Sequence, residues 1–140
     1  MGRKHRKVTG ACLCGQVEFT VELPAKWCAH CHCTRCQRSH GAGFVTWFGV
    51  NKEHFTLEKG EKLLRWVSSS KKSEYGFCGH CGSSMLFRST KWADEIHITL
   101  ANVTADIGLE PQAHAYFDTH VDWLNFEDGL ERHVDPNVKV

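Results

Sequence analysis

The 140-residue chain lacks most features that mark membrane, secreted or disordered proteins. No apolar run approaches the roughly 20 residues of a membrane-spanning helix, and the basic start MGRKHRK lacks the apolar stretch of a secretion signal. Only three prolines occur, and no segment is of low complexity. We therefore expect a cytoplasmic protein, in a reducing compartment where paired cysteines are more often metal ligands or redox centres than disulfides.

An excess of charge of one sign is also missing, because the formal net charge is only +1. This balance gives no reason to expect nucleic acid or a membrane surface as a partner. The length suits one domain with a core of its own. We expect a flexible basic tail at residues 1–9, a single domain at 10–135 and a second tail at 136–140. No pattern in the sequence predicts an oligomeric state.

Three catalytic signatures are absent from the chain. These are the H-E-x-x-H of zinc peptidases, the H-x-E with P-C-x-x-C of zinc deaminases, and the G-x-S-x-G nucleophile elbow. Their absence disfavours the water-activating and serine-based reactions that depend on them.

Long helical periodicity is scarce, and alternation with period two takes its place. From Gln16 to Leu23, the apolar residues Val17, Phe19 and Val21 alternate with polar ones, which predicts a half-buried strand. Further strands are expected at Phe44–Val50, Lys62–Ser68, Glu74–Phe77, Ser84–Phe87 and Glu95–Leu100, the last with Ile96, Ile98 and Leu100 on one face. Short helical turns are expected after Cys33 and around Asn51–His54. The sequence thus predicts a mainly β fold of short antiparallel strands.

Cysteine is the residue type that the chain has in abundance, with eight copies. They form three groups: C-L-C at Cys12 and Cys14; C-A-H-C-H-C-T-R-C at Cys28, Cys31, Cys33 and Cys36; and C-G-H-C at Cys78 and Cys81. Zinc takes four tetrahedral ligands in a structural site and three protein ligands in a catalytic one. Eight cysteines therefore suit two closed sites, or one closed site and one with three ligands.

The C-G-H-C pair has two interpretations, a zinc knuckle or a redox dithiol. A redox pair normally begins a helix, but Cys81 is followed by Gly82, a poor helix residue, and then by a predicted strand. We therefore favour a zinc knuckle. The same Cys-Gly ending occurs at Cys14, so we expect the two pairs to form one four-cysteine site, brought together by two strands lying side by side in a sheet.

The middle group leaves two possibilities. Cys28, Cys31, Cys33 and Cys36 could form a second closed site. Alternatively, the C-x-C-x-x-C residues Cys31, Cys33 and Cys36 could bind zinc with three ligands. The spacing does not decide between them. His30 and His32 are further candidate ligands, although we expect them to face solvent or to lie behind the ligands.

The chain resembles the glutathione-dependent formaldehyde-activating enzyme family, which also includes centromere protein V domains. The resemblance rests on GACLCGQVEF, CHCTRCQRSHGAGF, FCGHCGSSM, DEIHITLANV and PQAHAYFDTHVDWLNFEDGL, which together extend from about Gly10 to about His133. It implies the β-tent fold and two zinc ions per chain: a structural one on Cys12, Cys14, Cys78 and Cys81, and a catalytic one on Cys31, Cys33 and Cys36. Cys28 departs from the family pattern, and so does Asp122, where the family often has proline before the tryptophan.

The resemblance implies a carbon–sulfur lyase that condenses glutathione with formaldehyde to S-hydroxymethylglutathione. The metal chemistry agrees, because zinc with three thiolates carries a net charge of −1 and generates hydroxide poorly, yet can still bind and deprotonate a fourth thiol. We therefore expect a small thiol and an aldehyde as substrates. Loss of Cys33 should remove one zinc ion and the activity while the fold survives.

Other residues are weaker candidates. Phe44, Trp47 and Phe48 could wall a pocket, Arg35 and Arg38 could bind a substrate carboxylate, and His114, Asp118 or His120 could transfer a proton. For each of these we expect core packing or surface exposure instead, and we expect a turn at Asp128–Gly129. The alternative to an enzyme is a non-catalytic, zinc-stabilised binding module, because one fold can serve several functions.

Overall fold

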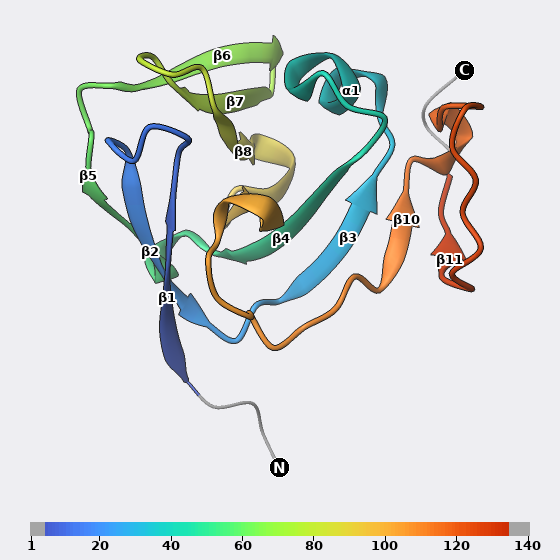
Figure 1. The fold of residues 1–140 in the computed structure, drawn as a ribbon, viewed down its shortest axis with the longest axis horizontal. Coiled ribbons are helices and arrows are strands. Elements are labelled where there is room, and N and C mark those ends of the chain that lie inside the picture. The colour runs from blue at the N-terminus through green and yellow to red at the C-terminus, as the bar shows by residue number, and fades with distance from the viewer. Residues whose placement is uncertain (1–4, 135–140) are drawn as a thin grey trace.

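The fold consists of two β-sheets and one short α-helix (Figure 1), in a computed structural model that describes residues 5–134. The strands are β1 Arg6–Ala11, β2 Glu18–Leu23, β3 Trp27–Cys31, β4 Val45–Asn51, β5 Phe55–Lys59, β6 Leu64–Ser70, β7 Ser73–Cys78, β8 Ser84–Ser89, β9 Glu95–Thr99, β10 Ala113–Ala115 and β11 Glu131–Arg132. The helices are α1 Thr34–His40 and the 3₁₀ turns η1 Lys52–His54, η2 Thr90–Trp92, η3 Leu100–Asn102 and η4 Phe117–Thr119.

The strands pair almost entirely in the antiparallel sense. The small sheet has the order β1-β2-β5, and the large sheet the order β11-β10-β3-β4-β9-β8-β7-β6. Among the strands of residues 5–134, the exception is β10, which runs parallel to both β3 and β11. The predicted fold class, a mainly β architecture of short antiparallel strands, is confirmed and matches the β-tent fold that the resemblance implies.

Strand β2 shows why these residues form sheet rather than helix. Phe19, Val21 and Leu23 are buried, whereas Glu22 between them is exposed. Alternate side chains of a strand point to opposite faces, so the period-two pattern places every apolar residue in the core. The strand begins two residues later than predicted, at Glu18.

Strand β9 differs from its prediction on two points. Ile96 and Ile98 are buried on one face, but His97 and Thr99 are buried as well, so both faces of the strand are covered. Leu100, expected to extend the strand, instead begins the turn η3. The strand lies between β4 and β8 near the middle of the large sheet, which explains the double burial.

The large sheet separates two apolar clusters. The main core contains side chains from both sheets, among them Phe19, Val21, Phe48, Leu86 and Ile98. The second, smaller cluster contains Cys36, Val45, Trp47 and Tyr75. The two faces of the large sheet therefore serve different purposes: one completes the core, and the other borders the C-x-C-x-x-C segment.

The predicted tail at residues 1–9 is too long. Strand β1 begins at Arg6 and pairs with β2 along its whole length, and Val8 is buried. Residues 6–9 are therefore strand, because the backbone hydrogen bonds to β2 and burial of Val8 stabilise an extended conformation. Residues 1–4 and 136–140 of the predicted tails lie outside the described residues.

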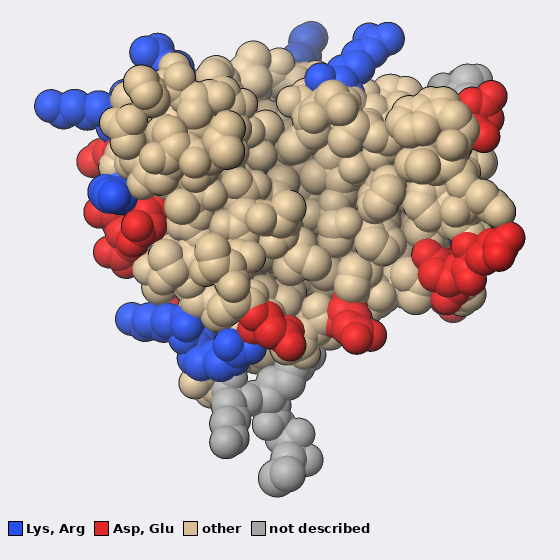
Figure 2. All heavy atoms as spheres, viewed as in Figure 1, with Lys and Arg blue, Asp and Glu red and all other residues tan. Residues whose placement is uncertain are grey.

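Charged side chains surround an uncharged area on one face of the molecule. In Figure 2 the Lys, Arg, Asp and Glu side chains stand around the edges of this face, and neither sign covers its middle. No helix within residues 5–134 is long and apolar enough to cross a membrane.

Candidate metal centres

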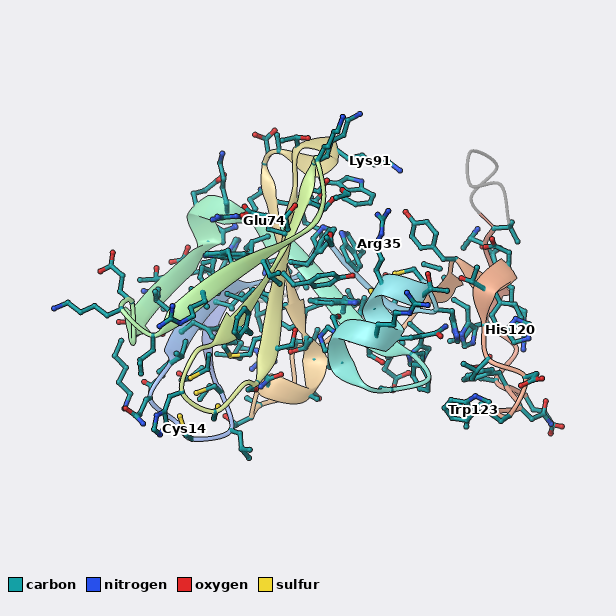
Figure 3. The ribbon with its side chains drawn as sticks, turned by 90° about the horizontal axis from the view of Figure 1, so that it is seen from above. Cys14, Arg35, Glu74, Lys91, His120 and Trp123 are labelled. Carbon is teal, nitrogen blue, oxygen red and sulfur yellow. The ribbon has the colours of Figure 1, made fainter. Side chains whose placement is uncertain are left out.

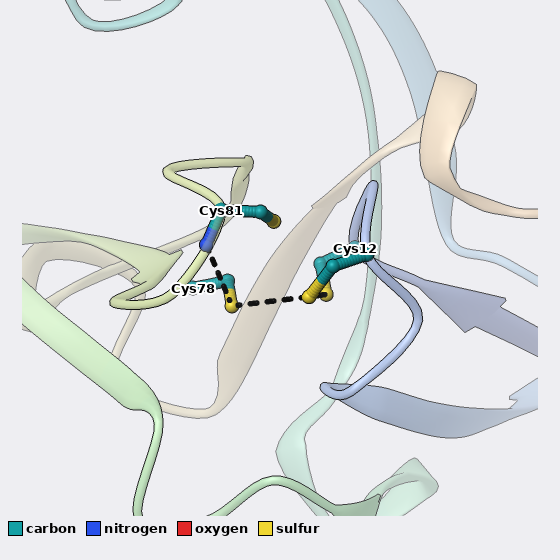
Figure 4. Close-up of side chains that lie close together, drawn as sticks. Cys12, Cys78 and Cys81 are labelled. Carbon is teal, nitrogen blue, oxygen red and sulfur yellow. Dashed lines mark hydrogen bonds between the residues drawn. The ribbon is translucent and has the colours of Figure 1, made fainter.

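The first cysteine cluster joins two loops that are far apart in the sequence. The sulfur atoms of Cys12, Cys14, Cys78 and Cys81 all lie within 4.8 Å of one another. Cys12 and Cys14 come from the loop between β1 and β2, and Cys78 and Cys81 from the end of β7 and the turn after it. Figure 4 shows Cys12 facing Cys78 and Cys81. The Cys12–Cys14 sulfur distance is 3.5 Å and the Cys14–Cys78 distance is 3.9 Å.

Each loop of this cluster has the backbone of a zinc knuckle. The N–H of Val17 donates to the Cys12 sulfur at 3.3 Å, and the N–H of Cys81 donates to the Cys78 sulfur at 3.5 Å. Each loop then turns at a glycine with positive φ, 77° at Gly15 and 80° at Gly82. Glycine adopts this conformation without the cost that a side chain brings, so the shared Cys-Gly ending reflects a shared turn.

The four sulfurs come together, but the prediction that two neighbouring strands of one sheet bring them together is wrong. The strands that follow the two cysteine pairs do not lie side by side, because β2 belongs to the small sheet and β8 to the large one. Cys12 and Cys78 are instead both buried in the main core. Cys14 is exposed and Cys81 half-buried, so the pairs meet between the two sheets at the rim of the core, and not along one sheet edge.

The second cluster is local, with all its residues at one corner of the chain. Cys31 ends β3, Cys33 is the N-cap of α1, and Cys36 lies in the first turn of α1. Their sulfurs lie within 4.8 Å of one another, and the Cys31–Cys36 distance is 3.6 Å. The N–H of Cys36 donates to the Cys33 sulfur at 3.3 Å, so a thiol replaces the usual hydroxyl or carboxylate cap.

Three thiols so close together do not ionise independently. Hydrogen bonds from Cys31 and Cys36 lower the pKa of Cys33 to about 3, whereas the same contacts with Cys33 and Cys36 raise the pKa of Cys31 well above its ordinary value. One thiolate forms, and its charge opposes ionisation of its neighbours. A divalent cation would stabilise all three thiolates together.

Both clusters fit a tetrahedral zinc ion. With Zn–S bonds of about 2.3 Å, tetrahedral geometry places the sulfurs about 3.8 Å apart. The Cys12–Cys14, Cys14–Cys78 and Cys31–Cys36 sulfur distances of 3.5, 3.9 and 3.6 Å lie close to that value, and the other pairs lie within 4.8 Å. The all-sulfur donor set is also one that zinc prefers.

Cys28 lies outside both clusters, and its position decides between the two possibilities for the middle group. Cys28 and Cys31 are three residues apart on β3, so their side chains point to opposite faces of the large sheet. Cys28 is 1% exposed in the main core, where burial raises the pKa of its thiol to about 11. A closed site that includes Cys28 is therefore not formed.

The two histidines next to the cysteines face away from the three sulfurs. His30 contacts the Thr46 hydroxyl at 2.8 Å, and His32 contacts His114 at 2.8 Å. Neither belongs to the cluster of possible ligands. His32 is fully buried and therefore does not face solvent; it lies behind the cysteines, against the segment that contains β10 and η4.

The remaining candidates are dispersed. Phe44 packs on His30 and His32, Phe48 lies in the main core, and Trp47 lies in the second cluster with Tyr75. Arg35 and Arg38 are exposed on α1; Asp118 and His120 lie in and after η4, with His120 stacked on Phe117. Figure 3 shows Arg35 beside α1, with Cys14 on one side of the molecule and His120 and Trp123 on the other.

Two residues that the sequence did not single out, Tyr75 and Asp128, contact members of the site. The Tyr75 hydroxyl lies 3.2 Å from the Cys36 sulfur, and burial raises the pKa of Tyr75. Around Tyr75, aromatic rings of Trp47, Phe87 and His40 form the surface next to the cysteines. Tyr75 occupies an ordinary alternating position of β7, so no local pattern distinguishes it. Asp128 was expected only to make a turn, but it also contacts His114 at 2.8 Å.

The sequence and the fold were each compared with known proteins. A family model described as glutathione-dependent formaldehyde-activating enzyme matches residues 7–119. A Halomonas elongata protein, named as a candidate enzyme of this kind, is 24% identical over 132 residues, covering 84% of this chain and 80% of that protein. A crystal structure of a Rhodobacter sphaeroides protein superposes with a TM-score of 0.61 at 22% identity, covering 70% of this chain and 89% of that one.

Proposed function

Because the chain belongs to the glutathione-dependent formaldehyde-activating enzyme family, we propose that it catalyses the addition of a thiol to an aldehyde at Cys31, Cys33 and Cys36. With glutathione and formaldehyde, the thiol sulfur forms a bond to the carbonyl carbon. The carbon–oxygen π bond breaks, and the proton released by the thiol ends on the oxygen. The product is S-hydroxymethylglutathione, and the reverse reaction is carbon–sulfur bond cleavage.

The proposal depends chiefly on one observation: three cysteine sulfurs converge at the corner between β3 and α1, and the fourth nearby cysteine does not join them. A tetrahedral zinc ion with three protein ligands is the arrangement of catalytic sites, whereas structural sites supply four. Zinc bound there would supply the positive charge that keeps an incoming thiol deprotonated at neutral pH. We assign the structural role to the second ion, at Cys12, Cys14, Cys78 and Cys81.

The residues around the three cysteines would orient the substrates. Trp47 and Tyr75 present an apolar surface that limits the access of water to the sulfurs. Arg35 is exposed on the helix turn that contains Cys36, where its guanidinium is suited to bind a carboxylate of glutathione through paired hydrogen bonds. The main chain of α1 fixes the position of Cys36 relative to Cys33.

Cobalt substitution followed by titration with glutathione tests the proposal. Addition of glutathione should change the visible absorption of the cobalt-loaded protein, and the zinc protein should accelerate S-hydroxymethylglutathione formation above the spontaneous rate. Cys33→Ser should abolish both effects, because it removes one of only three ligands. The matched control is Cys28→Ser, which alters a thiol outside the cluster and should preserve both.

A non-catalytic binding module would give a different result. In that case glutathione would leave the cobalt spectrum unchanged, and the rate of adduct formation would equal the uncatalysed rate in wild type and Cys33→Ser alike. That outcome would refute the proposed activity while leaving the metal-binding geometry in place.

A further inference from the structure

His32 lies between two of the three clustered cysteines but has its own, separate set of contacts. In an extended segment, alternate side chains point in opposite directions, so Cys31 and Cys33 face one way and His32 the other. The His32 side chain is completely buried. Its ring packs against Phe44, Phe117 and Phe126, with ring centroids 5.0–5.5 Å away.

A chain of hydrogen bonds leads from His32 to a carboxylate near the surface. His32 Nε2 lies 2.8 Å from His114 Nδ1, and His114 Nε2 lies 2.8 Å from Asp128 Oδ2. An ionised carboxylate can only accept, so His114 donates from Nε2, and in a neutral His114 ring Nδ1 then accepts from His32. The order Asp128–His114–His32 therefore fixes the tautomer and the ring orientation of both histidines.

The main chain of His32 is bound from the same side. Its N–H donates to the Ala115 carbonyl at 3.0 Å. Its carbonyl accepts from the Thr119 hydroxyl at 3.0 Å and from the Gln37 side-chain amide at 2.7 Å. Gln37 also donates to the Thr119 carbonyl at 3.0 Å, so α1 is joined to the same segment.

A third contact connects the segment of residues 113–128 to the loop after α1. At Gly43, a β-carbon would come within 2.8 Å of the Trp123 ring and of Leu124. Trp123 and Leu124 thus lie directly against Gly43. Residues 113–128 therefore contact the cysteine corner at the end of β3, in α1 and beyond it. We call residues 113–128 the C-terminal brace.

We propose that Asp128 and His114 are positioning residues, which act through His32 to keep the thiolates of Cys31 and Cys33 converged on one point. The proposal rests on the proposed function in assigning a metal ion to this cluster. Ligands held in place before binding lose less conformational entropy when the ion arrives, so the brace should raise metal affinity without supplying a ligand. Asp128 suits this role, since hydrogen bonds from the Leu130 N–H and from His114 keep its pKa below the ordinary value.

The four-cysteine cluster provides an internal reference. Its loops join β1 to β2 and β7 to β8, and Figure 3 shows Cys14 on the opposite side of the molecule from His120 of the brace. A change in the brace should therefore weaken one metal site and leave the other unaffected. General destabilisation of the protein would weaken both.

Cobalt titration of the metal-free full chain tests the proposal, and the Cys33→Ser protein supplies the spectrum of the four-cysteine cluster alone. We expect Asp128→Ala to lower the cobalt affinity of the three-cysteine cluster by several-fold, less than the roughly 10- to 100-fold that follows the loss of a direct hydrogen-bond partner of a ligand, because Asp128 acts through His114 and His32. The four-cysteine affinity should be unchanged. Asp128→Asn retains an accepting oxygen at the same position and should restore most of the lost affinity.

Two further variants supply a control carboxylate and a second way to break the same hydrogen bonds. Asp122→Ala removes an exposed carboxylate of the same segment and should behave as wild type. His114→Phe retains a ring against Phe117 and Phe126 but removes both hydrogen bonds, and should weaken the three-cysteine cluster as Asp128→Ala does.

Two results would contradict the inference in distinguishable ways. If Asp128→Ala and His114→Phe bind cobalt as Asp122→Ala does, or if they weaken both clusters equally, the positioning role is refuted and the proposed function is untouched. If wild type binds no more cobalt than Cys33→Ser does, the three-cysteine cluster holds no metal, and the proposed function fails together with this inference.

Discussion

The two cysteine clusters differ in how far the chain must fold to build them. Cys14 and Cys78 are separated by 64 positions, and their sulfurs meet only when the two sheets are packed together. Cys31 and Cys36 are five positions apart, within a single strand-to-helix corner. Metal in the first cluster would therefore cross-link the fold, whereas metal in the second would join residues that are already neighbours.

The two clusters also differ in the residues that surround them. Cys12 and Cys78 are part of the main core, so their cluster shares the apolar packing that stabilises the protein. The three-cysteine cluster lies on the other face of the large sheet, where Tyr75 and Trp47 border it and the C-terminal brace lies behind it. Burial differs in the opposite direction, because Cys14 of the four-cysteine cluster is exposed, whereas no sulfur-bearing residue of the three-cysteine cluster is.

The largest expected difference is in stability, between Cys78→Ser and Cys33→Ser. Structural zinc contributes on the order of 10 kcal/mol of apparent binding free energy, so losing a ligand at Cys78 should remove several kcal/mol from the free energy of unfolding. Cys33→Ser should leave the fold intact. Chemical denaturation of the zinc-loaded variants, with metal content measured in parallel, checks this; equal losses would contradict the division into structural and catalytic sites.

Cys28→Ser should have an intermediate effect, limited to the core. The hydroxyl would replace an apolar thiol that is 1% exposed, which should cost about 1–2 kcal/mol of stability through burial of an unpaired polar group. Both metal ions should remain, because Cys28 faces away from the other sulfurs. Elemental analysis beside urea denaturation distinguishes the two effects, and the loss of an ion would return Cys28 to the ligand set.

Alanine substitutions at two glycines should lower stability about as much as Cys28→Ser does, and their informative difference is in metal binding. Gly82 turns the knuckle after Cys81 at φ 80°, and Gly41 ends α1 beyond Cys36 at φ 60°. A β-carbon at either would meet nothing within 4 Å, so alanine should cost only the left-handed backbone, about 1–2 kcal/mol.

The two alanine variants should differ in metal binding despite similar costs. Gly82→Ala should weaken cobalt binding at the four-cysteine cluster alone, and Gly41→Ala at the three-cysteine cluster alone. If either substitution affects the distant cluster as strongly as its own, the clusters are coupled through the fold and are not independent.

Much of the fold was predictable because its signals are local. The alternation in β2 specifies a short stretch of backbone, and the strand predicted from it is observed. The spacing of the middle cysteine group left a four-cysteine and a three-cysteine cluster open, and the structure brings together Cys31, Cys33 and Cys36. Strands β3 and β10 were missed because their residues, such as Trp27–Cys31, do not alternate between apolar and polar. Had β3 been recognised, strand alternation would already have placed Cys28 opposite Cys31.

The sequence by itself determined the three cysteine groups, the short turn that keeps Cys31, Cys33 and Cys36 close together, and the glycine turns after Cys14 and Cys81, because each depends on a few consecutive residues. Only the tertiary structure decided that Cys12 and Cys14 meet Cys78 and Cys81 between two sheets, and that Asp128 reaches His32 through His114. Such contacts depend on how whole sheets and segments pack, and packing between distant residues leaves no mark in the spacing of neighbouring ones.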